Sequence, residues 1–128
     1  VNVASKCGLT PQYKGLQALY AEIGHEEFAI LAFPSNDFMG QEPGTPAEII
    51  EFCESNYQVT FPMFEKVHVK GEDQHPIYQF LSTGFEEPSW NFTKYLVDRS
   101  GKVIQRFDPR TAPDDPELRK RIDEALAE

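Results

Sequence analysis

Apolar residues recur along the chain with two different periods, which predict strands alternating with helices. Two short apolar runs, Val1–Ala4 and Phe28–Phe33, are typical of strands buried on both faces, and a proline ends the second run. Between these runs a helix is predicted, because four apolar residues repeat at helical spacing: Leu16, Leu19, Tyr20 and Ile23. Thr10 is the predicted N-cap of this helix, with Pro11 in its first position, and Gly24 is its predicted end.

The middle of the chain continues the alternation. The stretch TPAEIIEFCESN predicts a second helix that begins with a capping box, in which Thr45 is the N-cap and Glu48 reaches back to it. Val67–Val69 is predicted as a short strand and Pro76–Leu81 as a short helix. The stretch FTKYLVDRSGKVIQRF predicts a β-hairpin that turns at Asp98–Gly101.

The end of the chain predicts one more helix, which completes the order of elements. Asp115 is its N-cap, and its apolar face carries Leu118, Ile122, Ala125 and Leu126. Strands and helices in this order predict an α/β protein with a mixed central sheet and helices on both faces, which is the thioredoxin-like layout. Without any repeat or linker, residues 1–128 are expected to form a single domain.

Composition and charge narrow the classes of function. The net charge of −9 argues against nucleic acids or an anionic membrane as partners, because both would repel the chain. We expect no stable membrane association, since no apolar run approaches the ~18 residues of a membrane span. Two cysteines are too few for a disulfide scaffold, which favours a reducing cytoplasmic location. His25, His68 and His75 share no ligand spacing, so we expect neither a metal nor a cofactor.

Cys7 is the residue with the clearest chemical potential. It lies in the loop between the first strand and the first helix, at the sheet edge where ligands of open α/β proteins collect. A helix N-terminus favours a thiolate, and Lys6 adds a positive charge nearby. The alternative is a small buried residue, since free cysteines are often buried. A thioredoxin-type dithiol is excluded here, because Leu9 and Thr10 follow Gly8 where a CxxC motif would have its second cysteine.

Three stretches, NVASKCG, FPSNDFMGQEPG and WNFTKYLVD, together resemble the glutathione peroxidase family in its non-selenium, cysteine-containing form. The resemblance extends from Asn2 to about Phe107, with the motifs in the order of the family. It implies a thioredoxin-like fold. It also implies that the N-terminal hairpin of the family, and most of its first strand, are missing before Val1.

The resemblance implies the roles of four residues. Cys7 would be the peroxidatic thiolate, which a hydroperoxide oxidises to sulfenic acid. Gln41, Trp90 and Asn91 would be neutral donors that hold the thiolate and the oxyanion that develops on the leaving oxygen. Apart from the motif, Gln41 could be ordinary surface polarity before a turn, Trp90 a core anchor and Asn91 a residue at the entry to a strand.

Cys53 has two open interpretations. It lies beside isoleucines at helical spacing, which is typical of core packing. The resemblance to family members reduced by thioredoxin makes it the resolving cysteine, which would form a disulfide with Cys7 once its helix unwinds locally. The stretch between Leu81 and Trp90 is too short for the insertion through which tetrameric members of the family assemble. The resemblance therefore implies a monomer with an open site that could admit lipid hydroperoxides.

The acidic chain makes thioredoxin a better reductant than glutathione, whose carboxylates need basic residues. The alternative function is a redox sensor or relay that passes oxidation from Cys7 to a partner protein. An inactive fragment is a third possibility.

The chain departs from the family motif at two positions. Ser35 stands where many members have a third cysteine, and Asp37 introduces a carboxylate. If Asp37 points toward the site, its charge is expected to raise the pKa of Cys7.

Overall fold

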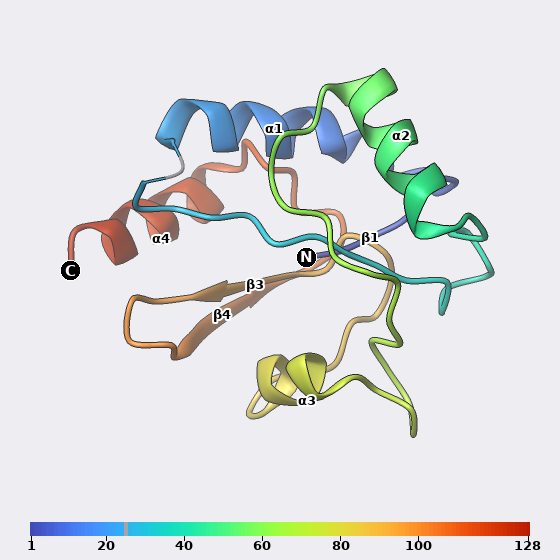
Figure 1. Ribbon diagram of the computed structural model, residues 1–128. Coiled ribbons are helices and arrows are strands. Elements are labelled where there is room, and N and C mark those ends of the chain that lie inside the picture. Colours follow the sequence, from blue (N-terminus) through green and yellow to red (C-terminus); the bar gives the residue numbers. More distant parts are fainter. Residues whose placement is uncertain (25) are drawn as a thin grey trace.

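The computed structural model describes residues 1–24 and 26–128 and contains four helices and four short strands within them (Figure 1). His25 lies outside the described residues. The elements in chain order are β1 (Asn2–Val3), α1 (Gln12–Ile23), β2 (Phe33–Pro34), α2 (Pro46–Tyr57), α3 (Pro76–Ser82), β3 (Lys94–Val97), β4 (Val103–Phe107) and α4 (Pro116–Leu126).

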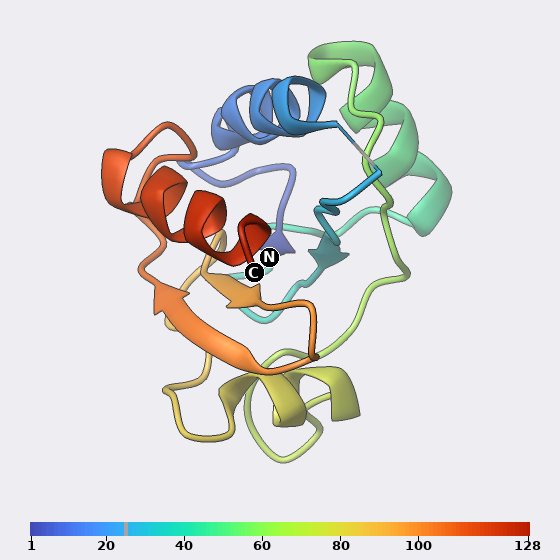
Figure 2. The same cartoon turned by 90° about the vertical axis from the view of Figure 1, so that its left-hand side faces the viewer.

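The strands form the middle layer of the molecule. β1 pairs in parallel with β2, while β3 and β4 form an antiparallel hairpin. The Phe92 N–H donates to the Asn2 carbonyl at 2.7 Å, so the segment before β3 lies beside β1. Helices α1 and α4 lie on one side of the strands and α3 on the other (Figures 1 and 2). This arrangement confirms the α/β class with helices on both faces, although the regular pairing forms two two-stranded sheets and not one continuous sheet.

Two predicted strands are wrong in position. The second strand occupies Phe33–Pro34 and not Phe28–Phe33, because β1 offers only two residues to pair with it. Val67–Val69 is not a strand: the pairing occurs earlier, at a bridge between Ala32 and Met63. Pro34 has no N–H to continue this ladder toward Val67, so only the Val67 N–H bonds to β2, at the Pro34 carbonyl, and the Val69 N–H donates to the Asp37 carboxylate.

The helix starts give one correction and two confirmations. Helix α1 begins after Pro11, and no side chain caps it. The Thr10 hydroxyl accepts from the Cys7 N–H and donates to the Ala4 carbonyl, so it joins the Cys7 loop to the end of β1. The capping box of α2 is present, and Asp115 caps α4. The hairpin turn is confirmed by the bond from the Gly101 N–H to the Asp98 carbonyl.

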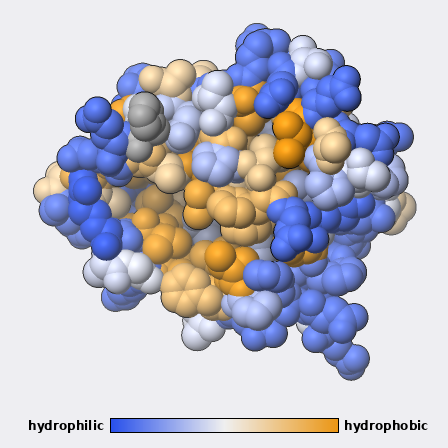
Figure 3. Space-filling model, in the orientation of Figure 1, coloured by the Kyte–Doolittle hydropathy of each residue, from blue (hydrophilic) through white to orange (hydrophobic). Residues whose placement is uncertain are grey.

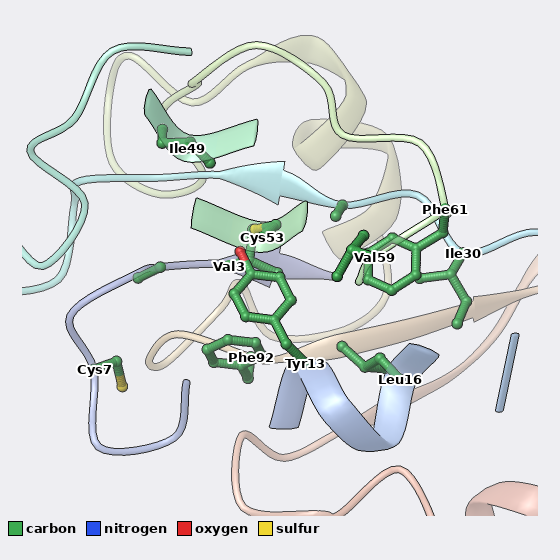
Figure 4. Packing of buried hydrophobic residues seen from close by; sticks show 12 residues of the cluster. Val3, Cys7, Tyr13, Leu16, Ile30, Ile49, Cys53, Val59, Phe61 and Phe92 are labelled. Atoms are coloured by element: carbon green, nitrogen blue, oxygen red, sulfur yellow. The ribbon is translucent and has the colours of Figure 1, made fainter. Parts of the chain in front are cut away.

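The largest buried cluster lies between β1, α1 and α2, and it contains both cysteines (Figure 4). Tyr13 and Phe92 are at its centre, with their rings edge to face at 5.4 Å. An apolar cavity of about 470 Å³ lies elsewhere, between the hairpin and helices α1 and α4, where Figure 3 shows a hollowed apolar face. Cys7 does not line this cavity, so the cavity is not where a substrate would meet the Cys7 thiol. Among the described residues, no helix has the length and apolar character to cross a membrane.

Candidate active site

The backbone of the loop after β1 holds the Cys7 thiol. Its Sγ atom accepts a hydrogen bond from the Leu9 N–H at 3.3 Å. The turn that provides this donor is closed by the Thr10 N–H, which donates to the Cys7 carbonyl at 3.0 Å. Only 8% of Cys7 is exposed, so a substrate would approach the sulfur through a narrow opening. The Leu9 donor escaped the sequence prediction, because every residue type except proline has a backbone N–H.

Trp90 supplies the second hydrogen bond to the sulfur. The indole Nε1 donates to Cys7 Sγ at 3.3 Å, across 83 positions of sequence. The Asn2 amide and the Thr93 hydroxyl both donate to the Trp90 carbonyl, which fixes the backbone at this point. The ring also packs against Phe38, with the ring centroids 5.4 Å apart. Trp90 is therefore both a packing residue and a donor to the thiol.

Gln41 and Asn91 form the other pair of the site. The Asn91 Nδ2 group donates to Gln41 Oε1 at 3.1 Å, and the Lys6 N–H donates to the Gln41 carbonyl at 3.0 Å. These bonds join the loop before α2 to the Cys7 loop and to the segment after Trp90. Among the described residues, Cys7 Sγ accepts from Leu9 and Trp90 but not from Gln41 or Asn91. The structure thus connects the four predicted residues: two donors reach the sulfur, and the amide pair is attached to the chain neighbours of Cys7 and Trp90.

This arrangement suits a sulfur atom that carries negative charge. Hydrogen bonds to an ionised acceptor are about twice as strong as those between neutral groups. Asn91 is fully buried, and its Oδ1 atom has no hydrogen-bond partner among the described residues. Because an amide oxygen only accepts, the amide nitrogens of the pair, and not Asn91 Oδ1, are the groups that could donate to a substrate oxygen.

Asp37 does not point toward Cys7, so the expectation that it raises the pKa of Cys7 finds no support in the geometry. One carboxylate oxygen lies 2.7 Å from His68 Nδ1, and the other accepts the Val69 N–H at 2.7 Å. Burial alone would raise the pKa of Asp37, but the hydrogen bonds from His68 and Val69 outweigh it and lower this pKa. The same contact raises the pKa of His68. Asp37 is therefore part of a link between two loops.

Cys53 lies inside α2 as a fully buried free thiol. Tyr13, with its hydroxyl oxygen, lies beside it, whereas Cys7 lies apart from it (Figure 4). Burial is the main cause that raises the pKa of Cys53 to about 11. The nucleophilic thiolate is therefore scarce while α2 is folded, at about 0.1% of Cys53 at pH 8.

Glu42 is a buried carboxyl that the sequence prediction treated only as part of a turn. It is 1% exposed, and neither of its oxygens makes a hydrogen bond among the described residues. Burial raises its pKa. Position next to Gln41 is the one signal in the sequence that could have drawn attention to it. His68 and His75 bind Asp37 and the Ile77 N–H, and the described residues contain no group of three side chains that could hold a metal ion.

Comparisons with known proteins identify the family. The family model for glutathione peroxidase matches residues 1–82. The chain is 54% identical over 118 residues to glutathione peroxidase homolog BsaA of Halalkalibacterium halodurans, covering 88% of this chain and 75% of the relative. It is 51% identical over 126 residues to hydroperoxy fatty acid reductase gpx1 of Synechocystis sp., covering 90% and 75%. It is 48% identical over 134 residues to glutathione peroxidase-like peroxiredoxin HYR1 of Saccharomyces cerevisiae, covering 100% and 81%.

A solved structure extends the similarity to the fold. The crystal structure of Trgpx in apo form superposes with a TM-score of 0.77 at 38% identity, covering 100% of this chain and 78% of the other. The fold and the relatives together define a thioredoxin-like peroxidase. The chain belongs to the glutathione peroxidase family, in its non-selenium form.

Proposed function

We propose that this peroxidase reduces hydroperoxides through the thiolate of Cys7. The thiolate attacks the terminal oxygen of the substrate, the O–O bond breaks, and two electrons pass from sulfur to oxygen. Cys7 becomes a sulfenic acid, and the other oxygen leaves as an alkoxide or hydroxide that takes up a proton to give an alcohol or water. The observation that carries the proposal is the 3.3 Å hydrogen bond from Trp90 Nε1 to Cys7 Sγ.

The amide groups of Gln41 and Asn91 serve the second part of the reaction, in which the leaving oxygen departs. Gln41 is bonded to Lys6, the neighbour of Cys7, and Asn91 follows Trp90, which supports the proposal that their amide groups stabilise the charge that develops on the leaving oxygen. A donor of this kind contributes about 10²- to 10³-fold to the rate in other enzymes.

Cys53 completes the cycle as the resolving cysteine. Its thiolate attacks the sulfur of the Cys7 sulfenic acid, a disulfide forms, and the hydroxyl group leaves as water after it takes up a proton. Sulfur–sulfur bonding needs Cα atoms within about 7 Å, so Cys53 must leave the interior of α2 first. No other cysteine is available in the chain.

Thioredoxin is the proposed reductant of this disulfide. Two relatives are named as peroxiredoxins, and the net charge of −9 disfavours the carboxylates of glutathione. We further propose a monomer that works in the cytoplasm, where both thiols stay reduced. One relative is named hydroperoxy fatty acid reductase, which supports lipid hydroperoxides among the substrates.

A relay of oxidation to a partner protein is the second candidate. It is favoured by the separation of Cys7 from the buried Cys53, because a thiol of a partner could reach the sulfenic acid before Cys53 does.

The test follows NADPH oxidation with thioredoxin, thioredoxin reductase and hydrogen peroxide. We expect steady turnover from the wild type and none from Cys7→Ser. Cys53→Ala should consume about one equivalent of peroxide and then stop, because alanine preserves the packing but cannot resolve the sulfenic acid. Steady turnover of Cys53→Ala would disprove the resolving role. A mixed disulfide with another protein, formed without turnover, would favour the relay.

A further inference from the structure

Glu42 carries an ionisable carboxyl group at a position that is closed to water. Its carboxyl group is buried at the end of the loop that carries Gln41, three residues before the N-cap Thr45 of α2. Its own N–H donates to Asn36 Oδ1 at 2.8 Å, which holds the backbone in place. Ser5 faces the carboxyl, but neither oxygen reaches hydrogen-bond geometry with it. An ionised carboxylate in such a place is poorly compensated.

The ionisable groups around Glu42 come from helices α1 and α2 and from two loops. Tyr13 of α1 and Cys53 of α2 both feel its charge, which raises the pKa of each of these groups. The ammonium groups of Lys6 and Lys66 act in the opposite sense and favour the ionised carboxyl. Desolvation is nevertheless the largest effect, so burial raises the pKa of Glu42.

We propose that Glu42 is a positioning residue for the resolving step: when ionised, its buried carboxylate favours opening of α2 and thereby releases Cys53 toward Cys7. This inference rests on the proposed resolving role of Cys53. The carboxylate gains water when the segment before α2 moves outward, and Cys53 becomes exposed in the same movement. Reduced protein with neutral Glu42 keeps α2 closed.

The sign of the pH dependence follows from the raised pKa of Glu42. Below the ordinary pKa of a glutamate the group is neutral in the closed and the open states, and it does not affect opening. As the pH rises, the open state loses its proton first, so opening becomes easier. The effect is complete once the pH exceeds the pKa of Glu42 in the closed state.

A direct effect of the Glu42 charge on the pKa of Cys53 would change the reaction rate of Cys53 in the opposite direction, which makes the proposal testable. The negative charge of Glu42 raises the pKa of Cys53 in the closed state. If that effect dominated, Glu42→Gln would make Cys53 react faster. If opening dominates, Glu42→Gln makes Cys53 react more slowly.

The experiment measures the rate at which 4,4′-dithiodipyridine modifies Cys53 between about pH 4 and pH 8. A Cys7→Ser background leaves Cys53 as the reacting thiol. We expect Glu42→Gln to slow modification about tenfold at pH 8, with the ratio falling to one only below the ordinary pKa of a glutamate. The matched control Glu51→Gln removes an exposed charge from α2 and should stay within about twofold of its parent.

Equal or faster modification of Glu42→Gln at pH 8 would overturn the proposal, as would equal slowing in Glu51→Gln. Thermal unfolding verifies that the variants fold, and Glu42→Met is the substitute if the glutamine variant does not. Peroxide added to the protein with both cysteines then tests the resolving role separately. If Glu42→Gln slows the modification of Cys53, Glu42 controls the opening of α2. If peroxide then produces no Cys7–Cys53 disulfide, the resolving role of Cys53 is refuted.

Discussion

At the scale of single residues, the site depends on donors directed at one sulfur atom. Cys7 Sγ accepts one hydrogen bond from backbone and one from an indole, at 3.3 Å each. The Leu9 donor belongs to a tight turn and remains whatever side chain occupies position 9. The Trp90 donor depends on the side chain itself, so substitution of Trp90 is the most direct way to test its contribution.

Trp90→Phe should lower the rate constant for oxidation of Cys7 by hydrogen peroxide about 10- to 100-fold. Phenylalanine keeps most of the contact with Phe38 but has no N–H to donate, and a hydrogen bond to a charged group is worth about 1.5–3 kcal/mol. The measurement is the loss of free Cys7 thiol in a single turnover, with thermal unfolding as the control for packing. An unchanged rate constant in a folded variant would show that the indole only packs.

At the scale of elements, α2 combines a well-defined start with a buried thiol. Its capping box joins Thr45 and Glu48 through two reciprocal hydrogen bonds, at 3.0 and 3.3 Å. Its end is fixed by Gln58, whose N–H donates to the Glu54 carbonyl at 3.2 Å. Opening of α2 must break one of these ends before Cys53 can move. The cap should therefore influence the rate of disulfide formation.

Thr45→Ala should increase the rate of Cys7–Cys53 disulfide formation up to about fivefold after one equivalent of peroxide. Loss of an N-cap destabilises a helix by about 1 kcal/mol, which enlarges the open population by that factor. Acid quenching followed by thiol labelling measures the rate. Thr83→Ala is the matched control, because its hydroxyl donates to the Gln79 carbonyl in α3. A rate that is unchanged, or that falls, would mean that disulfide formation does not require α2 to open.

At the scale of the whole molecule, close packing joins the first helix to the loop before the last one. A Cβ atom at Gly15 of α1 would lie 3.0 Å from Pro113 Cγ and 3.1 Å from Pro113 Cβ. The Gln12 side chain donates to the Pro109 carbonyl at 2.7 Å, and Lys94 Nζ donates to the same carbonyl at 2.9 Å. These contacts set the distance between α1, β3 and the loop that follows β4.

Gly15→Val should lower the free energy of unfolding by about 2 kcal/mol, because the added methyl groups meet a rigid proline ring. Urea unfolding followed by circular dichroism measures this change. Ala18→Val places the same side chain on the exposed face of α1 and should change stability by less than about 1 kcal/mol. Equal effects of the two substitutions would show that the loop moves aside at little cost.

Elements with local signals were predictable from the sequence. The capping box of α2, the Asp115 cap of α4 and the turn at Asp98–Gly101 each depend on residues within four positions of one another. Thr10 looked like a cap for the same reason, but its hydroxyl bonds to Cys7 and Ala4 instead. Because the Thr10 hydroxyl already bonds to these two buried backbone groups, it does not cap α1.

The strands were harder to predict, because a strand exists only where a partner meets it in register. Phe28–Phe33 has the composition of a strand, yet β1 pairs with Phe33–Pro34. The direction of the Asp37 carboxylate likewise depended on which loop lies next to it. Burial of Glu42 beside a turn of polar and small residues could not be read from its neighbours in the chain.

The sequence by itself determined the family and the positions of the helices and the hairpin, and it predicted the four site residues, because motifs and capping signals are local in the chain. Tertiary structure alone decided that Trp90 and the Leu9 N–H share one sulfur, that Gln41 binds Asn91, and that Glu42 is buried without a hydrogen-bond partner among the described residues. Hydrogen bonds across 50 or more positions, and the loss of water around a carboxyl, arise only when distant segments pack together.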